Sequence, residues 1–299
     1  MLPAFLRGPF AALSDHLVYS SSLYADLRSR VTRMEGAMID FSRPGTTPAD
    51  ARCRKAAQLI RPYTTSATLL RVGDEGDGGY VMADHFTTTT AISIGIGGNV
   101  SWDLAMSSRG YSIAMFDPTI AAEPATVPNA TFHRIGLGTP VQSAASGLEL
   151  ESLEQLRTRT GIPEVENATL KIDVEGAEWD ALIDVSSFDR YEQIVIEMHD
   201  LARLDDEESA HNVLAVLANI HSSHVPIHVH ANNEAPVIQF GTYWLPDVLE
   251  VTYLRRADAG AATPASELSI QLDRPSNARF ADLSLAGLLT VDLIGSDAS

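Results

Sequence analysis

LKIDVEGAEW, residues 170–179, carries the strongest structural signal in this chain. The mostly apolar run 168–172 predicts a buried strand. That strand ends on Asp173, and the residues from Glu175 onward predict a helix that begins at once. Ligands of open α/β sheets sit at the carboxyl ends of the strands. We therefore expect Asp173 to face a cleft rather than the core.

The composition is that of a soluble globular protein. The chain has 299 residues, 45% of them hydrophobic, which is enough for one large or two small domains. It has no apolar run of about 18 residues, and its N-terminus lacks the basic and long apolar regions of a signal peptide. Cys53 is the only cysteine, so no internal disulfide can form. These features predict a cytoplasmic protein without a membrane span.

The strong negative charge restricts the class of partner. The formal net charge is −18, and no long run of basic residues occurs. Nucleic acids are bound through Lys and Arg contacts to phosphate. We therefore expect no nucleic-acid partner, and instead a neutral or cationic small molecule or a saccharide.

The first 66 residues predict a helical N-terminal extension. Apolar residues recur at helical spacing over 17–39, a Pro- and Gly-containing linker follows over 40–50, and a second helix is predicted over 51–60. The first helix would either pack on the main domain or join two copies into a homodimer.

Residues 67–256 predict an α/β domain, and residues 257–299 a tail packed on it, with 275–285 lying over the domain. The last strand follows a strand–loop–strand passage without a helix, so it should run antiparallel to its neighbour. This gives a Rossmann-like, mostly parallel sheet with one reversed strand near the end, the arrangement of class I methyltransferases. The predicted strands are 69–72, 80–83, 91–96, 111–116, 131–135, 168–172, 193–198, 227–231 and 247–254, and the predicted helices lie near 100–109, 150–160, 176–184 and 206–222.

A glycine-rich turn follows the strand that begins at Ala91. Gly95, Gly97 and Gly98, with Asn99 beside them, precede a predicted helix start near residue 101. Glycine lets the backbone turn sharply and approach a ligand closely. A dinucleotide site uses G-x-G-x-x-G, but Val100 occupies the third glycine position here. The shorter G-x-G form suits S-adenosylmethionine, which has no pyrophosphate.

An acidic residue ends the next strand. Asp117 follows strand 111–116, twenty residues after Gly97. A carboxylate at this place in nucleotide-binding folds accepts the hydroxyls of a ribose. The glycine turn and Asp117 together predict the donor site, with a plain tight turn and an exposed Asp as the structural alternative.

Titratable residues also end the later strands. Asp173 ends one strand, Glu197 and His199 the next, and His230 and Asn232 the one after it. If all three strand ends meet at one cleft, Asp173 or His199 could act as general base with Glu197 orienting it. His199 would then titrate near its ordinary pKa of about 6.5. His230 and Asn232 are the candidates for binding the acceptor.

A divalent metal is the alternative use of this cluster. The set mixes histidine with carboxylates and lacks the all-oxygen ligands that magnesium prefers, which favours metal-free chemistry. Glu175 and Glu178 lie in the first turn of the predicted helix, where the helix dipole favours negative charge. We expect both to serve mainly as helix-start residues.

A second glycine patch, RVGDEGDGGYVM (71–82), precedes the cofactor strand. Structurally, it is a turn between two strands. Functionally, Arg71, Asp77 and Gly79 could cover the amino-acid end of the cofactor, with Arg71 meeting its carboxylate.

Seven segments together resemble the FkbM-type methyltransferase domain, in its branch with a D-G-G-Y turn, and the resemblance covers residues 69–256. In this family's pattern, Gly95, Gly97 and Gly98 line the donor, Asp117 binds its ribose and Asp173 faces the reaction. The resemblance implies S-adenosylmethionine as donor and an oxygen acceptor on a sugar or secondary metabolite. The segments are RVGDEGDGGYVM, SIGIGGNVSWD, MFDPT, LKIDVEGAEWDAL, IEMHD, HVHANN and LEVTYLRR.

The sequence therefore predicts an S-adenosylmethionine-dependent O-methyltransferase. Two alternatives remain open. A nicotinamide-dependent oxidoreductase is disfavoured by Val100 and by the reversed strand, and a non-catalytic binding or scaffold protein is disfavoured by the intact Asp173, Glu197 and His199.

Overall fold

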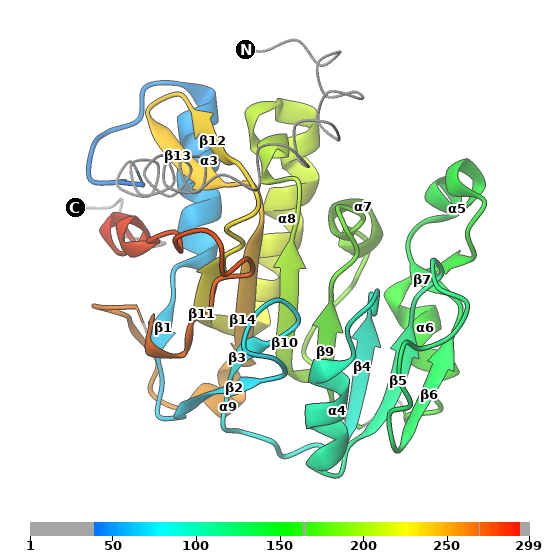
Figure 1. Cartoon of the computed structure of the whole chain (residues 1–299). Helices are drawn as coiled ribbons and strands as arrows, with labels where there is room; N and C mark the ends of the chain where they lie inside the picture. Colours follow the sequence, from blue (N-terminus) through cyan, green and yellow to red (C-terminus); the bar gives the residue numbers. More distant parts are fainter. Residues whose placement is uncertain (1–38, 164–165, 269, 294–299) are drawn as a thin grey trace.

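A seven-stranded sheet forms the centre of the molecule (Figure 1). The computed structural model describes residues 39–163, 166–268 and 270–293, so most of the helix expected over 17–39 lies outside the described residues. Within the seven-stranded sheet, the strands run parallel except β14, which is antiparallel to both of its neighbours. The order across the sheet is β11 (His224–Ala231), β14 (Leu249–Arg255), β10 (Tyr191–Met198), β9 (Ala168–Ile172), β4 (Thr90–Ile94), β5 (Ser112–Phe116) and β6 (Ala130–His133).

This strand order confirms the Rossmann-like fold. The chain runs outward from β4 to β6 and then crosses back to β9 and β10, so β4 and β9 flank the topological switch point. The reversed strand is β14, and it is reached through a hairpin of β12 (Val237–Phe240) and β13 (Tyr243–Pro246) rather than a helix. Its antiparallel direction is as expected, and it lies between β10 and β11.

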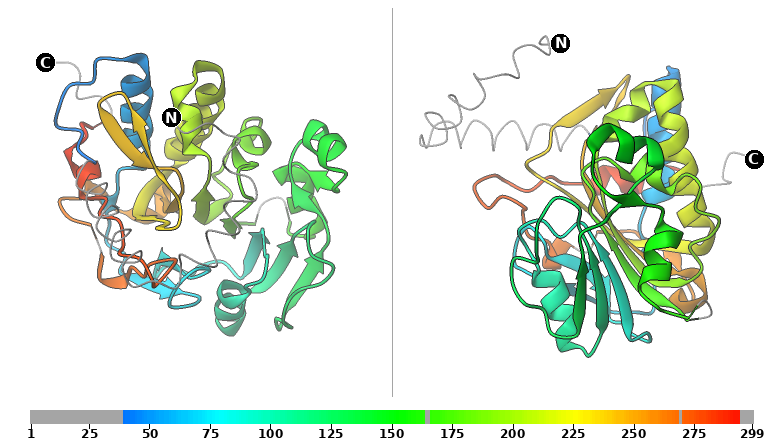
Figure 2. Two further views of the ribbon diagram at one scale, coloured as in Figure 1. Left: turned by 45° about the horizontal axis from the view of Figure 1, so that its top comes forward. Right: turned by 90° about the vertical axis from the view of Figure 1, so that its right-hand side faces the viewer.

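Alternating side chains cover the two faces of the sheet differently. Ile92 and Ile94 of β4 pack on the face with α3 (Pro48–Ile60), α7 (Glu178–Leu182) and α8 (Glu207–Ser223). Ala91 of β4 and Val195 of β10 pack on the opposite face, against α4 (Ser101–Ser108) and the hairpin of β2 (Leu69–Val72) and β3 (Tyr80–Ala83). The right-hand view of Figure 2 shows the sheet between these two layers.

The β2–β3 hairpin is fixed to the sheet by buried polar side chains. The Gln193 amide of β10 accepts a hydrogen bond from Ala83 N at 2.9 Å and donates to the carbonyl oxygens of Ala83 and His85. The hydroxyl of Thr252 on β14 donates to Val81 O at 2.6 Å. These bonds satisfy backbone groups that no strand partner could reach.

Helix α3 starts earlier than expected. Thr47 caps it in a capping box with Asp50, so residues 48–50 belong to the helix rather than to the linker expected over 40–50. Cys53, Ala56 and Ile60 are buried in the same core as the sheet. The boundary at residue 66 stays a prediction, and α3, which precedes it, contributes to the packing of the α/β domain.

The remaining elements are short. Helix α7 begins at Glu178, two residues later than expected, because a turn occupies 173–177.

Helix α5 (Pro140–Ser146) was not expected from the sequence. None of the described helices is long and apolar enough to cross a membrane. The other elements are β1 (Tyr63–Thr64), β7 (Gly136–Leu137), α5 (Pro140–Ser146), β8 (Leu150–Glu151), α6 (Leu153–Arg159), η2 (Leu201–Asp205), α9 (Arg256–Ala259), β15 (Thr263–Pro264), η3 (Ile270–Leu272) and η4 (Ala286–Thr290).

We predict that Gln193→Leu lowers the free energy of unfolding by roughly 2–4 kcal/mol, since it leaves buried backbone groups of Ala83 and His85 without their partner. Urea unfolding followed by tryptophan fluorescence measures this. The same substitution at the exposed Gln239 should change stability by less than about 0.5 kcal/mol. Equal effects at the two positions would contradict this role of Gln193.

Candidate active site

A cavity of about 710 Å³ opens at the carboxyl ends of β4, β5 and β9. It lies at the topological switch point, where open α/β sheets bind ligands. The glycine turn and Asp117 form part of its wall, and Asp173 with Glu175 forms another part. A second cavity, of about 810 Å³, is lined by β1, β11 and the C-terminal segment and shares no lining residue with the first. Its larger volume does not make it the candidate site, because its lining includes no carboxyl end of the central sheet's strands, where α/β sheets bind ligands.

The glycine turn has different constraints at each position. A Cβ at Gly95 would lie 1.5 Å from Asp173 O, so only glycine lets β4 and β9 approach this closely. Gly97 has φ +53°, and a Cβ there or at Gly98 would meet no atom within 4 Å. These two glycines therefore border open space in the cavity, as expected for a wall that receives a ligand.

Asp117 holds the glycine turn in place. Its Oδ2 accepts hydrogen bonds from Ile96 N at 2.9 Å and Gly97 N at 2.8 Å, and its Oδ1 accepts from the backbone N and the hydroxyl of Thr119. Burial raises its pKa, but these hydrogen bonds outweigh burial and lower it. A ribose hydroxyl could bind this carboxylate in place of the Thr119 hydroxyl.

The D-G-G-Y turn is tied to the start of α4. Asn99 Nδ2 donates to Asp77 O at 3.0 Å, and Asn99 Oδ1 accepts from Ser101 N. Asp77 and Asn99 line the cavity, as does Gly78. Burial and the negative charge of Asp173 raise the pKa of Asp77. This turn thus covers one side of the candidate donor site.

Arg71 and Gly79 do not reach the cavity. The Arg71 guanidinium donates to the carbonyl oxygens of Asp74, Gly76 and Leu272, so it is occupied with the turn itself. A Cβ at Gly79 would lie 1.9 Å from Asp74 O. The expected contact of Arg71 with a cofactor carboxylate is not supported by this geometry, because its donors are bound to the backbone.

His199 lies at the centre of a carboxylate cluster at the ends of β9 and β10. Its Nε2 is 3.5 Å from Glu175 Oε2, 3.8 Å from Glu197 Oε1 and 4.0 Å from Asp173 Oδ1. The two strand ends expected to meet here do so. Asp173 and Glu175 line the cavity, and His199 lies behind them with 9% of its surface exposed.

Glu178 orients this histidine. Although it is the first residue of α7, its side chain is fully buried, and Oε1 lies 2.7 Å from His199 Nδ1 and accepts the His199 backbone N–H at 3.2 Å. It is therefore more than a helix-start residue. Its charge was visible in the sequence, but its burial depends on how α7 packs.

The cluster has strongly shifted pKa values. Burial lowers the pKa of His199, but the hydrogen bond that its Nδ1 donates to Glu178 and the charges of Glu178, Glu197 and Asp173 outweigh it and raise the pKa to about 9. Burial and the charges of Asp173 and Glu250 raise the pKa of Glu197 to about 8. Both shifts are upward, so the carboxylates that surround His199 move its pKa above the expected value of about 6.5 and favour the protonated imidazole.

Lys171 is a functional candidate that we did not expect from the sequence. Its side chain is buried, donates to Gly95 O at 2.8 Å and has its Nζ 4.0 Å from Asp173 Oδ2. The sequence feature that could have revealed this residue is a lysine within the otherwise apolar strand 168–172. The Lys171 side chain joins the glycine turn to Asp173 across the cavity wall.

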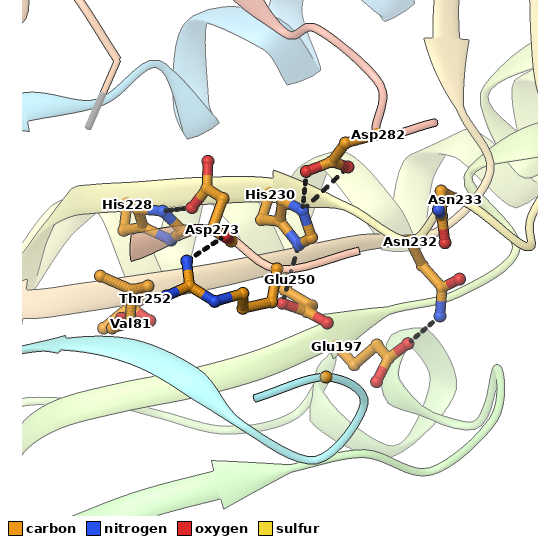
Figure 3. Close-up of polar contacts among 12 residues, drawn as sticks. Val81, Glu197, His228, His230, Asn232, Asn233, Glu250, Thr252, Asp273 and Asp282 are labelled. Carbon is orange, nitrogen blue, oxygen red and sulfur yellow. Dashed lines mark hydrogen bonds and ion pairs between the residues drawn. The ribbon is translucent and has the colours of Figure 1, made fainter. Parts of the chain in front are cut away.

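The end of β11 does not meet this cluster directly. Because β14 lies between β10 and β11, His230 is bound elsewhere, with Nδ1 3.2 Å from Glu250 and Nε2 3.0 Å from Asp282 (Figure 3). His230 is 3% exposed, so its expected acceptor-binding role is not supported. Asn232 alone reaches the cluster, donating to Glu197 Oε1 at 3.0 Å.

Three of these residues could hold a divalent metal. One ligand atom from each of Asp173, Glu175 and His199 lies within 4.8 Å of the others. The cavity beside them, lined by Asp117, the glycine turn and Asp173, could hold a nucleoside-type cofactor. The arrangement suits a group transfer in which a proton is removed near Asp173.

The comparison with protein families agrees with this fold. Residues 34–229, more than half of the chain, match the model of a family described as a methyltransferase domain. The chain therefore belongs to this methyltransferase-domain family. A search of curated proteins finds no match to the chain.

We predict that His230 stays protonated well above pH 7. Burial lowers its pKa, but the hydrogen bonds that its ring donates to Asp282 and Glu250 raise it from 6.5 to about 10. Its stabilising effect should be complete below pH 6.5 and be lost as the pH rises through about 10. Imidazole NMR should show a lower pKa for His230 in Asp282→Asn, and no change in the exposed-site control Asp184→Asn. Titration of wild-type His230 near 6.5 would contradict the prediction.

Proposed function

We propose that the chain is an S-adenosylmethionine-dependent O-methyltransferase of the FkbM type, acting on a hydroxyl of a saccharide or secondary metabolite. The observation that carries the proposal is the cavity at the switch point. The open glycine turn borders it at one place and the carboxylate cluster at another. A donor bound between them would have its adenosine and its reacting group at different ends.

The chemistry of the cavity wall supports this orientation of the donor. Asp117 ends β5 beside the glycine turn and can accept ribose hydroxyls. Asp77 lies near the negative charges of the cluster and can accept a bond from the ammonium of the methionine moiety. Asp173 and Glu175 supply negative charge near a sulfonium cation.

The nicotinamide alternative lacks support at the same turn. Val100, in the position of the third fingerprint glycine, is buried and is the N-cap residue of α4. A pyrophosphate site requires close approach of the backbone there. The turn therefore favours a donor without pyrophosphate.

Proton removal is assigned to Asp173. The donor supplies an electrophilic methyl group, and in-line displacement depends mainly on positioning. Asp173 lines the cavity, whereas His199 lies behind it, and the carboxylates around His199 raise its pKa and so disfavour the neutral imidazole that a base requires. Asp173 is thus better placed to accept the proton of the acceptor hydroxyl, while His199 and Glu197 position it.

The remaining expectations stay proposals. They comprise a cytoplasmic location, an acceptor that is not nucleic acid, and pairing of two copies through the N-terminal helix. The net charge of −18 supports the second of these.

We predict micromolar binding of S-adenosylhomocysteine in calorimetry, about −8 kcal/mol. Asp117→Ala should weaken it by roughly 1.5–3 kcal/mol, because a charged hydrogen-bond acceptor and the anchor of the glycine turn are lost. Asp184→Ala, at an exposed site away from the cavity, is the matched control. Binding of NADH without any adenosylhomocysteine signal would rule out the proposal.

The oxygen acceptor is tested with methyl-labelled donor and a panel of polyhydroxylated compounds. Label should enter a product that resists mild alkali, as an ether does and an ester does not. Label found only in amines would assign the methyl transfer to nitrogen instead.

A further inference from the structure

We infer that Asp173, Glu175 and His199 form a binding site for a divalent transition-metal cation at the edge of the donor cavity. The role given to the cation below rests on the proposed methyl transfer to a hydroxyl. The site itself does not, because it is argued from three side chains and from the way the fold holds them.

The distances fit a cation between the three ligand atoms. Metal–ligand bonds of about 2.1 Å place two ligands of one cation about 3.0–4.2 Å apart. His199 Nε2 is 3.5 Å from Glu175 Oε2 and 4.0 Å from Asp173 Oδ1. Both separations exceed the ~2.7–3.2 Å of an N–H···O hydrogen bond. The two separations from His199 therefore suit ligands of one ion, and the Asp173 and Glu175 oxygens lie within 4.8 Å of each other.

The imidazole is held in the orientation that a metal ligand needs. Glu178 Oε1 lies 2.7 Å from Nδ1, which leaves Nε2 directed toward Glu175 and Asp173. Histidine ligands commonly donate their second N–H to a carboxylate, which fixes the ring. His199 is 9% exposed, and its Nε2 lies 3.5 Å from Glu175, 3.8 Å from Glu197 and 4.0 Å from Asp173, each separation longer than a hydrogen bond. A buried nitrogen among carboxylates, which would exchange its proton for the cation on binding, is the independent sign of a ligand here.

A strained turn places Glu175 beside this nitrogen. Glu175 has φ +54°, a left-handed conformation that is unfavourable for residues other than glycine and costs on the order of 1–3 kcal/mol. Gly176 follows with φ +97°, and a Cβ there would lie 2.5 Å from Asp200 Oδ2. The turn keeps the exposed Glu175 side chain over His199 rather than in a helical direction.

Lys171 does not take the place of the cation. Its Nζ is bound to Gly95 O at 2.8 Å and lies 4.0 Å from Asp173 Oδ2, whereas Oδ1 is the oxygen nearer to His199. One carboxylate oxygen therefore faces the lysine and the other remains for the metal.

A second buried histidine, His230, has both of its ring nitrogens hydrogen-bonded to carboxylates. His230 also lies between two carboxylates, but its nitrogens are within 3.2 Å of Glu250 and 3.0 Å of Asp282. Both ring nitrogens are thus engaged and none is left for a metal. The contrast sets His199 apart from a histidine that only balances charge.

The ligand set selects the kind of cation and its role. One imidazole and two carboxylates suit Mn²⁺ or a similar transition metal better than Mg²⁺, which prefers oxygen ligands and retains several waters. Three protein ligands leave coordination positions open. An acceptor hydroxyl bound there would lose its proton more easily, beside the expected position of the donor methyl group.

The test is titration of the full chain with MnCl₂, followed by the electron paramagnetic resonance signal of free Mn²⁺. We expect saturable binding of one ion, weakened at least tenfold in Asp173→Asn, Glu175→Gln and His199→Gln. Glu178→Gln retains all three ligands and should weaken binding about 10–100-fold through loss of ring orientation. The matched control is Asp180→Asn, because Asp180 faces Arg203 and Asn212 instead.

The outcomes separate the site from the proposed function. No binding at millimolar Mn²⁺, or binding that the ligand variants leave unchanged, would overturn the site. Calorimetry with S-adenosylhomocysteine in chelator tests the donor site independently of the metal. If Mn²⁺ binds at this site but chelator leaves methyl transfer to a hydroxylated acceptor unchanged, the role in acceptor activation is overturned.

Discussion

The close pairing of β4 with β9 is the constraint on which the site depends. Asp173 N donates to Ile94 O at 2.9 Å, and Gly95 has no room for a Cβ because Asp173 O would lie 1.5 Å away. Since the chain leaves these two strands in opposite directions across the sheet, a cavity opens where they end. The glycine turn and Asp173 thus become parts of one cavity wall, although they lie far apart in the sequence.

Much of this arrangement could be predicted from the sequence, because it depends on local patterns. The apolar run 168–172 and the run before Gly95 form strands close to their predicted bounds. Parallel strands bring their carboxyl ends to one edge, so Asp117 and Asp173 could be placed at the cavity without any knowledge of packing. The reversed strand β14 followed from the absence of a helix after the β11 segment.

Other features depended on tertiary packing and could not be predicted. The insertion of β14 between β10 and β11 separates His230 from the cluster, and no local pattern sets this order. Glu178 has the sequence context of an ordinary helix-start residue, yet packing of α7 buries it against His199. That contact and the neighbouring carboxylates raise the pKa of His199 to about 9, because charges from separate segments converge on one ring.

The proposed function depends on a donor that lies between the glycine turn and the carboxylate cluster. A crystal structure of the full chain with S-adenosylhomocysteine is the decisive experiment. We expect adenosine beside Asp117 and Gly97, with the sulfur directed toward Asp173 and Glu175. A ligand bound in the cavity between β1, β11 and the C-terminal segment, or bound in the reverse orientation with adenine at Asp173, would contradict it.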